Sequence, residues 1–207
     1  MVAAPTILIA TSNDGKRQEY ADLFPPGITV LSLAHVAVTL PPETADTFAG
    51  NARLKAITAA EQSDHLVLAD DSGLEVDALA GAPGVLSARY AGEPSDDQRN
   101  MALVLKQLRG VPAARRTARF RCAIAVVDRS GRIIEGHGTC DGAIAAAPAG
   151  TNGFGYDPIF VLPDGRRMAE LEPGEKNRLS HRAAAFRSIL SEVVAVVLQE
   201  ASEVDQR

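Results

Sequence analysis

Two adjacent carboxylates, Asp70 and Asp71, follow a short apolar run at residues 66–69. Such a run is typical of a buried strand, and open α/β sheets bind their ligands at strand ends. Two neighbouring carboxylates at this position repel each other unless a cation offsets their charge. Because Mg²⁺ prefers carboxylate, water and phosphate oxygens, the pair predicts a magnesium site. The alternative is that one Asp caps a turn and the other faces solvent.

A second polar segment stands between an apolar strand and a predicted helix. The unpaired N–H groups of a helix N-terminus suit a phosphate group, and a lysine adds positive charge. The pattern is not a Walker A loop. An ordinary capped turn with a solvated lysine is the alternative. The segment comprises Thr11, Ser12, Asn13, Asp14, Gly15 and Lys16.

Polar residues around the next predicted helix extend the set of candidates. Glu43 follows Pro41 and Pro42 and is a candidate third carboxylate, although the helix dipole also favours a Glu near a helix start. Asn51 and Lys55 lie four residues apart and therefore share one helix face. That spacing fits a face directed at a cleft and a solvated face equally well.

A Gly- and aromatic-rich segment, GFGYDP, begins at Gly153. Its glycines permit close approach of the backbone to a ligand. Phe154 or Tyr156 can stack on a base, and Asp157 can accept a hydrogen bond from a base or ribose. A tight turn with an aromatic anchor is the alternative.

Cationic side chains open the predicted last helix. Ser180 is the expected N-cap, so His181 and Arg182 fall in the first turn, where the helix dipole disfavours cations by a few tenths of a kcal/mol. A placement against this local rule indicates an anionic or oxygen-bearing ligand. The alternative is that both side chains reach solvent.

The chain that carries these groups alternates strand and helix in its first half and becomes β-rich in its second. Apolar runs bounded by turn residues predict the strands, and helical spacing predicts the helices. The two long central strands are expected to form an antiparallel hairpin, and the last helix carries an apolar stripe. The expected strands are residues 6–10, 28–33, 66–69, 117–127 and 132–144, and the expected helices are residues 16–24, 44–62, 95–108 and 180 onward.

This order predicts an α/β fold with a mixed sheet and flanking helices. We expect one domain over residues 1–207, elongated and two-lobed, with a central cleft. The net charge of −5 argues against broad nucleic-acid binding. No apolar run reaches the ~20 residues of a membrane span, and the N-terminus lacks a signal-peptide pattern. Two cysteines are too few for a disulfide scaffold, which favours a cytoplasmic protein with buried thiols.

Five motifs together resemble those of the inosine triphosphate pyrophosphatase family. They are TSNDGKRQE, ADDSGL, GAPGVLSARYAG, FGYDPIF and KNRLSHR, which stand in the family's order between about Ile7 and Phe186. The resemblance implies hydrolysis of ITP, dITP and XTP to the nucleoside monophosphate and pyrophosphate. It also implies dependence on Mg²⁺ and a homodimer.

The resemblance also implies roles for single residues. Asp71 matches the catalytic acidic residue, which also contacts metal. Glu43 aligns with a metal-binding Glu, and Asp70 is expected to support the metal. Lys16, Lys55 and Lys176 are expected to neutralise phosphate oxygens. The residues that match substrate contacts are Thr11 to Lys16, Ser72, Phe154, Gly155, Tyr156, Asp157, Lys176, His181 and Arg182.

Two other classes of function fit the same carboxylates. A phosphatase with an aspartyl nucleophile would release orthophosphate, although its motif usually places the two Asp residues one position apart. A non-catalytic nucleotide sensor would bind ITP with Mg²⁺ and show no turnover.

Overall fold

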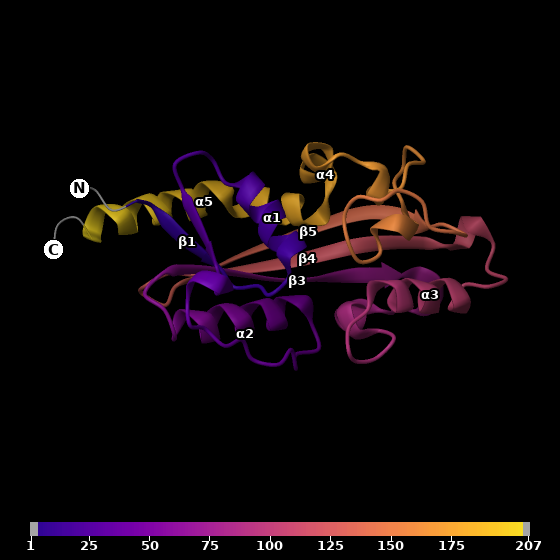
Figure 1. Ribbon diagram of the computed structural model, residues 1–207, viewed down its shortest axis with the longest axis horizontal. Coiled ribbons are helices and arrows are strands. Elements are labelled where there is room, and N and C mark those ends of the chain that lie inside the picture. Colours follow the sequence, from indigo (N-terminus) through magenta and orange to yellow (C-terminus); the bar gives the residue numbers. More distant parts are fainter. Residues whose placement is uncertain (1–3, 205–207) are drawn as a thin grey trace. The chain divides into compact units, whose positions relative to one another are not determined.

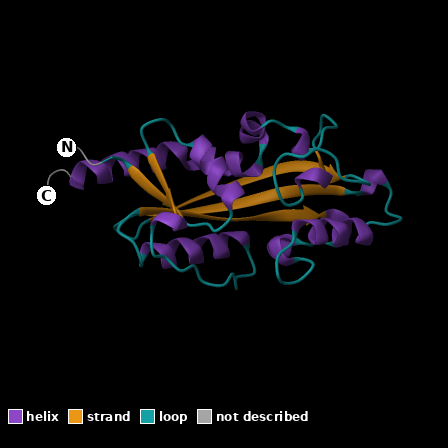
Figure 2. Ribbon diagram, in the orientation of Figure 1, coloured by secondary structure: helices purple, strands orange, loops and turns teal. Residues whose placement is uncertain are grey.

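A computed structural model describes residues 4–204, and its six strands form one sheet in the order β2-β1-β3-β4-β5-β6. β1 pairs in parallel with β2 and with β3, whereas β5 and β6 pair antiparallel. The predicted α/β fold with a mixed sheet and flanking helices is therefore confirmed (Figure 2). The strands are β1 Thr6–Ile9, β2 Thr29–Ser32, β3 Leu66–Val76, β4 Thr117–Val127, β5 Ile133–Ile144 and β6 Phe160–Val161.

Five α-helices accompany the sheet among the described residues (Figure 1). None of the helices within residues 4–204 has the length and apolar character needed to cross a membrane. The helices are α1 Asp14–Leu23, α2 Phe48–Ala60, α3 Asp97–Gln107, α4 Pro173–Leu179 and α5 His181–Val204.

The chain divides into two compact units. The first comprises residues up to Asp71, residues 123–138 and residues from Ala185 onward, and the second comprises residues 72–122 and 139–184. Each unit has its own buried core. The single domain, the two-lobed outline and the central cleft stay predictions.

In the first unit, α2 packs on one face of the sheet through a stripe of small residues. Ala52, Ala56 and Ala59 are fully buried and contact a cluster that includes Leu8 of β1 and Val67 of β3. Because alanine is short, the helix lies close to the strands, and polar residues next to the stripe are buried with it. The opposite face carries α1 and α5 (Figure 1).

The predicted apolar stripe of α5 is largely confirmed. Phe186, Val193 and Val197 are buried, and Phe186 meets edge-on the rings of Tyr20, in α1, and Phe24, the C-cap of α1. The ring centroids lie 5.9 Å from Tyr20 and 4.6 Å from Phe24. This side of the first unit is therefore stabilised by aromatic packing.

The core of the second unit forms around the continuation of the long strands. Leu74 of β3, Phe120 of β4 and Phe160 of β6 are buried there with Val104 and Leu108 of α3. The rings of Phe120 and Phe160 lie 4.4 Å apart. The segment between β5 and α4 consists mostly of loops and short 3₁₀ turns (Figure 2).

The prediction that the strand at residues 66–69 stops at Asp70-Asp71 is wrong. β3 includes both carboxylates and continues to Val76, with Leu74 and Val76 fully buried. A carboxylate can stay within a buried strand when cations and hydrogen-bond donors compensate its charge. The strand continues here because both carboxylates have such partners.

Three predicted helix starts also differ from the structure. α2 begins at Phe48 rather than Thr44, since Thr47 caps it by accepting from Gly50 N at 3.0 Å. Asp96, rather than Ser95, caps α3. α1 begins at Asp14 rather than Lys16, since Asn13 caps it. Lys176 lies in α4, a helix that the sequence did not predict.

Candidate functional site

The first unit brings together five of the predicted site residues. Asp70 and Asp71 are 1% and 5% exposed. Lys16 Nζ lies 3.0 Å from Asp70 Oδ2. Lys55 Nζ lies 2.5 Å from Glu43 Oε1 and 4.0 Å from Asp71 Oδ1. Each aspartate of the pair therefore has its own lysine.

Lys16 reaches Asp70 because β1 and β3 are neighbours in the sheet. The turn after β1 is built by Thr11 Oγ1, which accepts from Asn13 N, and by Asn13 Oδ1, which accepts from Lys16 N at 2.9 Å. Asn13 is thus the N-cap of α1, as in an ordinary capped turn. The lysine, however, is not solvated, since its side chain is only 13% exposed.

The shared helix face of Asn51 and Lys55 points at carboxylates rather than solvent. Both residues are buried on α2, one turn apart. Asn51 Nδ2 donates to Asp71 Oδ2 at 3.0 Å. The i,i+4 spacing left the direction of this face open, and the contact with Asp71 is a part of the site that the sequence did not predict.

The charges of this cluster shift the pKa of its members. Burial raises the pKa of the Asp71 carboxyl above its ordinary value, and Glu43 acts in the same direction. Lys55 and Lys16 oppose that rise without cancelling it. Burial alone would lower the pKa of Lys55, but the surrounding carboxylates raise it above its ordinary value. Lys55 is therefore a stable cation at neutral pH.

The carboxylates of the first unit fit a magnesium ion that completes its coordination with water and phosphate oxygens. Within residues 4–204, no group of three or more His, Cys, Asp or Glu side chains is arranged to hold a metal by itself. Mg²⁺ is usually bound by one or two carboxylates together with water and substrate phosphates. Asp71 and Glu43 flank the same ammonium group of Lys55 and supply two carboxylates of this kind.

A second cluster lies in the second unit and centres on Asp157, which is 3% exposed. Its Oδ2 accepts from Phe154 N at 2.9 Å and from Lys176 Nζ at 2.6 Å. Gly153 has φ +76°, and a Cβ atom there would lie 2.1 Å from the same oxygen. Glycine is therefore required for the loop to close over Asp157.

Two cations stand near the ring of Phe154. Lys176 Nζ lies 4.6 Å and Arg182 Cζ 5.6 Å from the ring centroid. Arg182 is almost fully buried and donates from Nη2 to Ser72 Oγ at 2.9 Å. This part of the unit thus combines an aromatic face with hydrogen-bond donors.

The remaining predicted residues of the second unit have structural contacts. Tyr156 belongs to the core, and its hydroxyl donates to the carbonyl oxygen of Ser87 at 2.7 Å, which matches the aromatic-anchor alternative. Gly155 N donates to Asp97 Oδ2 at 2.7 Å. His181 stacks on Phe120 with ring centroids 4.8 Å apart. Neither Asp97 nor Phe120 stands in a sequence motif that could have identified it.

The start of α5 confirms Ser180 as its N-cap, because Ser180 Oγ accepts from Ala183 N at 3.2 Å. His181 and Arg182 follow in the first turn and are both buried. The alternative that both side chains reach solvent is therefore wrong.

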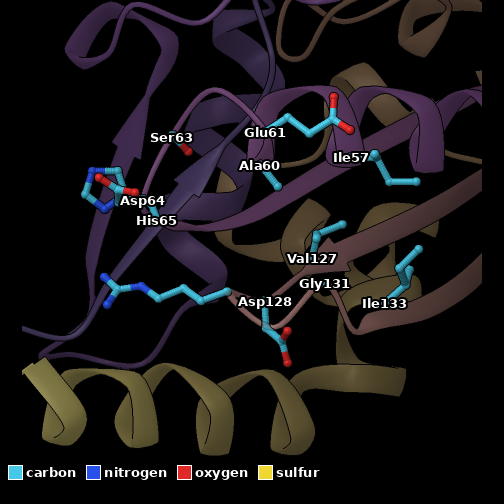
Figure 3. Close-up of a pocket in the computed structure, with 11 residues that line it drawn as sticks. Ile57, Ala60, Glu61, Ser63, Asp64, His65, Val127, Asp128, Gly131 and Ile133 are labelled. Carbon is cyan, nitrogen blue, oxygen red and sulfur yellow. The ribbon is translucent and has the colours of Figure 1, made fainter.

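A pocket of about 780 Å³ lies elsewhere in the first unit. It is formed by the end of α2 and the turn that joins β4 to β5, with Ile57, His65 and Asp128 among its lining residues (Figure 3). None of the predicted site residues lines it.

Comparisons with known proteins find relatives over most of the chain. The model of the Ham1 family matches residues 7–192. The dITP/XTP pyrophosphatase of Geobacillus kaustophilus is 54% identical over 185 residues, which cover 87% of this chain and 90% of that protein. The dITP/XTP pyrophosphatase of Bacillus subtilis is 47% identical over 194 residues, covering 91% and 97%. The structure of the Staphylococcus aureus Ham1 protein matches with a TM-score of 0.81 and 38% identity, covering 92% of this chain and 98% of that one.

Proposed function

Because the chain belongs to the Ham1 family, we propose that it hydrolyses dITP, ITP and XTP to the nucleoside monophosphate and pyrophosphate. The observation that carries the proposal is the buried pair Asp70 and Asp71, in which each carboxylate has its own lysine. Relatives named dITP/XTP pyrophosphatase match over most of both chains, which supports the same reaction here. Such an activity removes non-canonical purine nucleotides from the nucleotide pool.

In this proposal Asp71 holds Mg²⁺ together with Glu43 or Asp70. The bound ion supplies positive charge that offsets the triphosphate and the departing pyrophosphate. Lys16 and Lys55 each lie against a carboxylate and can turn to phosphate oxygens when the triphosphate binds. The two lysines therefore offset most of the negative charge of Asp70, Asp71 and Glu43 before the substrate arrives.

Asp71 is also the proposed general base. The attacking water must lose a proton, and a carboxylate of raised pKa is a better acceptor than an ordinary one. Burial raises the pKa of Asp71, while its lysine neighbours keep the ionised form accessible.

The second cluster is proposed to bind the nucleoside and to select the base. Phe154 offers a stacking face, and Arg182 and His181 offer donors. Hypoxanthine and xanthine carry an oxygen at position 6, whereas adenine carries an amino group. Protein donors at this position would form hydrogen bonds to the oxygen of the first two bases. With adenine, the same donors would face an amino group that is itself a donor. Such a mismatch can lower kcat/KM for the wrong base by roughly 10⁴-fold relative to the right one.

The experiment that tests the proposal identifies the products from ITP and Mg²⁺. Pyrophosphate with IMP supports it. Orthophosphate would favour an aspartyl phosphatase, and binding of ITP by calorimetry without turnover would favour a nucleotide sensor. The proposal also includes a homodimer, which the family resemblance implies, and a cytoplasmic location, which the low cysteine content favours. Sedimentation of the purified protein tests the dimer.

A further inference from the structure

We propose that Asn51 is a positioning residue that fixes both Asp71 and the segment carrying Glu43 for metal-dependent hydrolysis. The inference rests on the proposed function. It assigns a role to a buried side chain that the mechanism above does not use.

The side-chain amide of Asn51 is fully buried and bonded at both ends. Nδ2 donates to Asp71 Oδ2 at 3.0 Å, and Oδ1 accepts from Ala45 N at 2.9 Å. A backbone N–H can only donate, so the amide oxygen must face Ala45 and the amide nitrogen must face the carboxylate. The orientation of the amide follows from this pairing.

The helix that carries Asn51 is a rigid support. Ala52 and Ala56 bury one side of α2 in the core of the first unit. Asn51 lies next to this stripe and one turn before Lys55. Functional groups are held most accurately when their supports stand on packed helices rather than on loops.

Glu43 needs such support because its surroundings are irregular. Residues 36–47 form neither helix nor strand. Lys55 contacts Glu43 directly, and Asn51 holds Ala45, two residues further along the chain. If Lys55 turns to a phosphate oxygen, the bond from Ala45 N to Asn51 still restrains the segment. Asn51 thus preserves the carboxylate arrangement during turnover.

The two oxygens of Asp71 then have different tasks. Oδ2 accepts from Asn51, whereas Oδ1 is the oxygen that lies 4.0 Å from Lys55 Nζ. We assign Oδ1 to the metal or the attacking water. A donor fixed on one oxygen sets the rotation of the carboxylate and so the direction of the other.

Two substitutions separate the bonds of Asn51. Asn51→Ala removes both. Asn51→Asp keeps an acceptor for Ala45 N but removes the donor to Asp71 and adds a like charge. Loss of an outer partner of a metal ligand typically reduces activity about 10- to 100-fold, so kcat for pyrophosphate release from ITP should fall by this range in both variants. KM should change by less than about threefold, because no substrate contact is removed.

A binding measurement without nucleotide provides the second readout. Mn²⁺ alone, followed by electron paramagnetic resonance, should bind Asn51→Ala about tenfold more weakly than the unchanged protein. Melting temperatures of all variants show whether they fold.

Gln62→Ala is the matched control. Gln62 lies in the turn after α2 and anchors the same segment, since it donates to Thr39 O and accepts from Thr39 N, both at 3.0 Å. It contacts neither Asp71 nor Glu43 through these bonds. The control should lose some stability and keep kcat and Mn²⁺ affinity.

Two results would overturn the inference: kcat of Asn51→Asp within about twofold of the unchanged protein, or Mn²⁺ affinity of Asn51→Ala equal to that of Gln62→Ala. Failure of the proposed function is distinguishable, since the unchanged protein would then release no pyrophosphate from ITP. In that case the Mn²⁺ comparison still decides whether Asn51 positions a metal ligand.

Discussion

The Nζ atom of Lys176 lies 2.6 Å from Oδ2 of Asp157, and both side chains are buried. A buried ion pair is costly to break from one side, because the remaining charge stays in a poorly solvating environment. This pair therefore has structural consequences that can be measured apart from any role in substrate binding.

Lys176→Met should lower the free energy of unfolding by about 3–5 kcal/mol, since it leaves Asp157 buried without its cation. Adding Asp157→Asn should restore part of the loss. The new amide is uncharged, and its oxygen can still accept from Phe154 N. Urea denaturation of the single and double variants measures both effects. If the loss of unfolding free energy in the double variant equalled the sum of the losses in the two single variants, the pair would not be energetically coupled.

Gly153→Ala should destabilise the protein more than Gly165→Ala. Both glycines have positive φ, +76° and +91°, so both substitutions strain the backbone. Only at Gly153 would the added Cβ meet another atom, Asp157 Oδ2, at 2.1 Å. The clash should lower the free energy of unfolding by a further amount of about 1–3 kcal/mol. Equal melting temperatures for the two variants would contradict the required close approach.

Asp71→Asn should abolish pyrophosphate release without lowering the melting temperature in EDTA. A carboxyl whose folded pKa is raised contributes stability below its unfolded value, here 3.8, and that stability is lost as pH rises through the folded pKa. At neutral pH the ionised Asp71 carboxylate therefore lowers the free energy of unfolding. The amide removes this cost. A variant with near-normal turnover would refute the assignment of Asp71.

Cys140 should make stability fall with pH in a defined window. Burial raises the pKa of its thiol from 9.0 to about 11. Below pH 9 the thiol is neutral in both states and its contribution is complete. Between pH 9 and about 11 only the unfolded chain ionises, so the free energy of unfolding falls. The difference between the unchanged protein and Cys140→Ala isolates this effect, and a difference independent of pH would exclude it.

Much of the fold follows from patterns in the sequence. The strand at residues 117–127 matches β4 at both ends, and its C-terminal end is marked by the turn that begins at Asp128. The apolar spacing of Phe186, Val193 and Val197 likewise gave the buried face of α5. Such periodic signals report burial directly.

Other features depended on contacts that sequence spacing does not contain. β3 continues past Asp71 because Asn51 and two lysines compensate its carboxylates, and these partners come from α1 and α2. The sequence spacing predicts that Asn51 and Lys55 share one face of a helix. It does not predict whether that face contacts the sheet or solvent. The partners became evident only when α2 was placed against the sheet.

The most direct test of the central claim is a panel of nucleoside triphosphates with Mg²⁺, scored as kcat/KM for pyrophosphate release. The account predicts that ITP, dITP and XTP are cleaved to pyrophosphate, with ATP disfavoured by roughly 10⁴-fold through the donor mismatch at position 6. Cleavage of ATP as fast as ITP would contradict it.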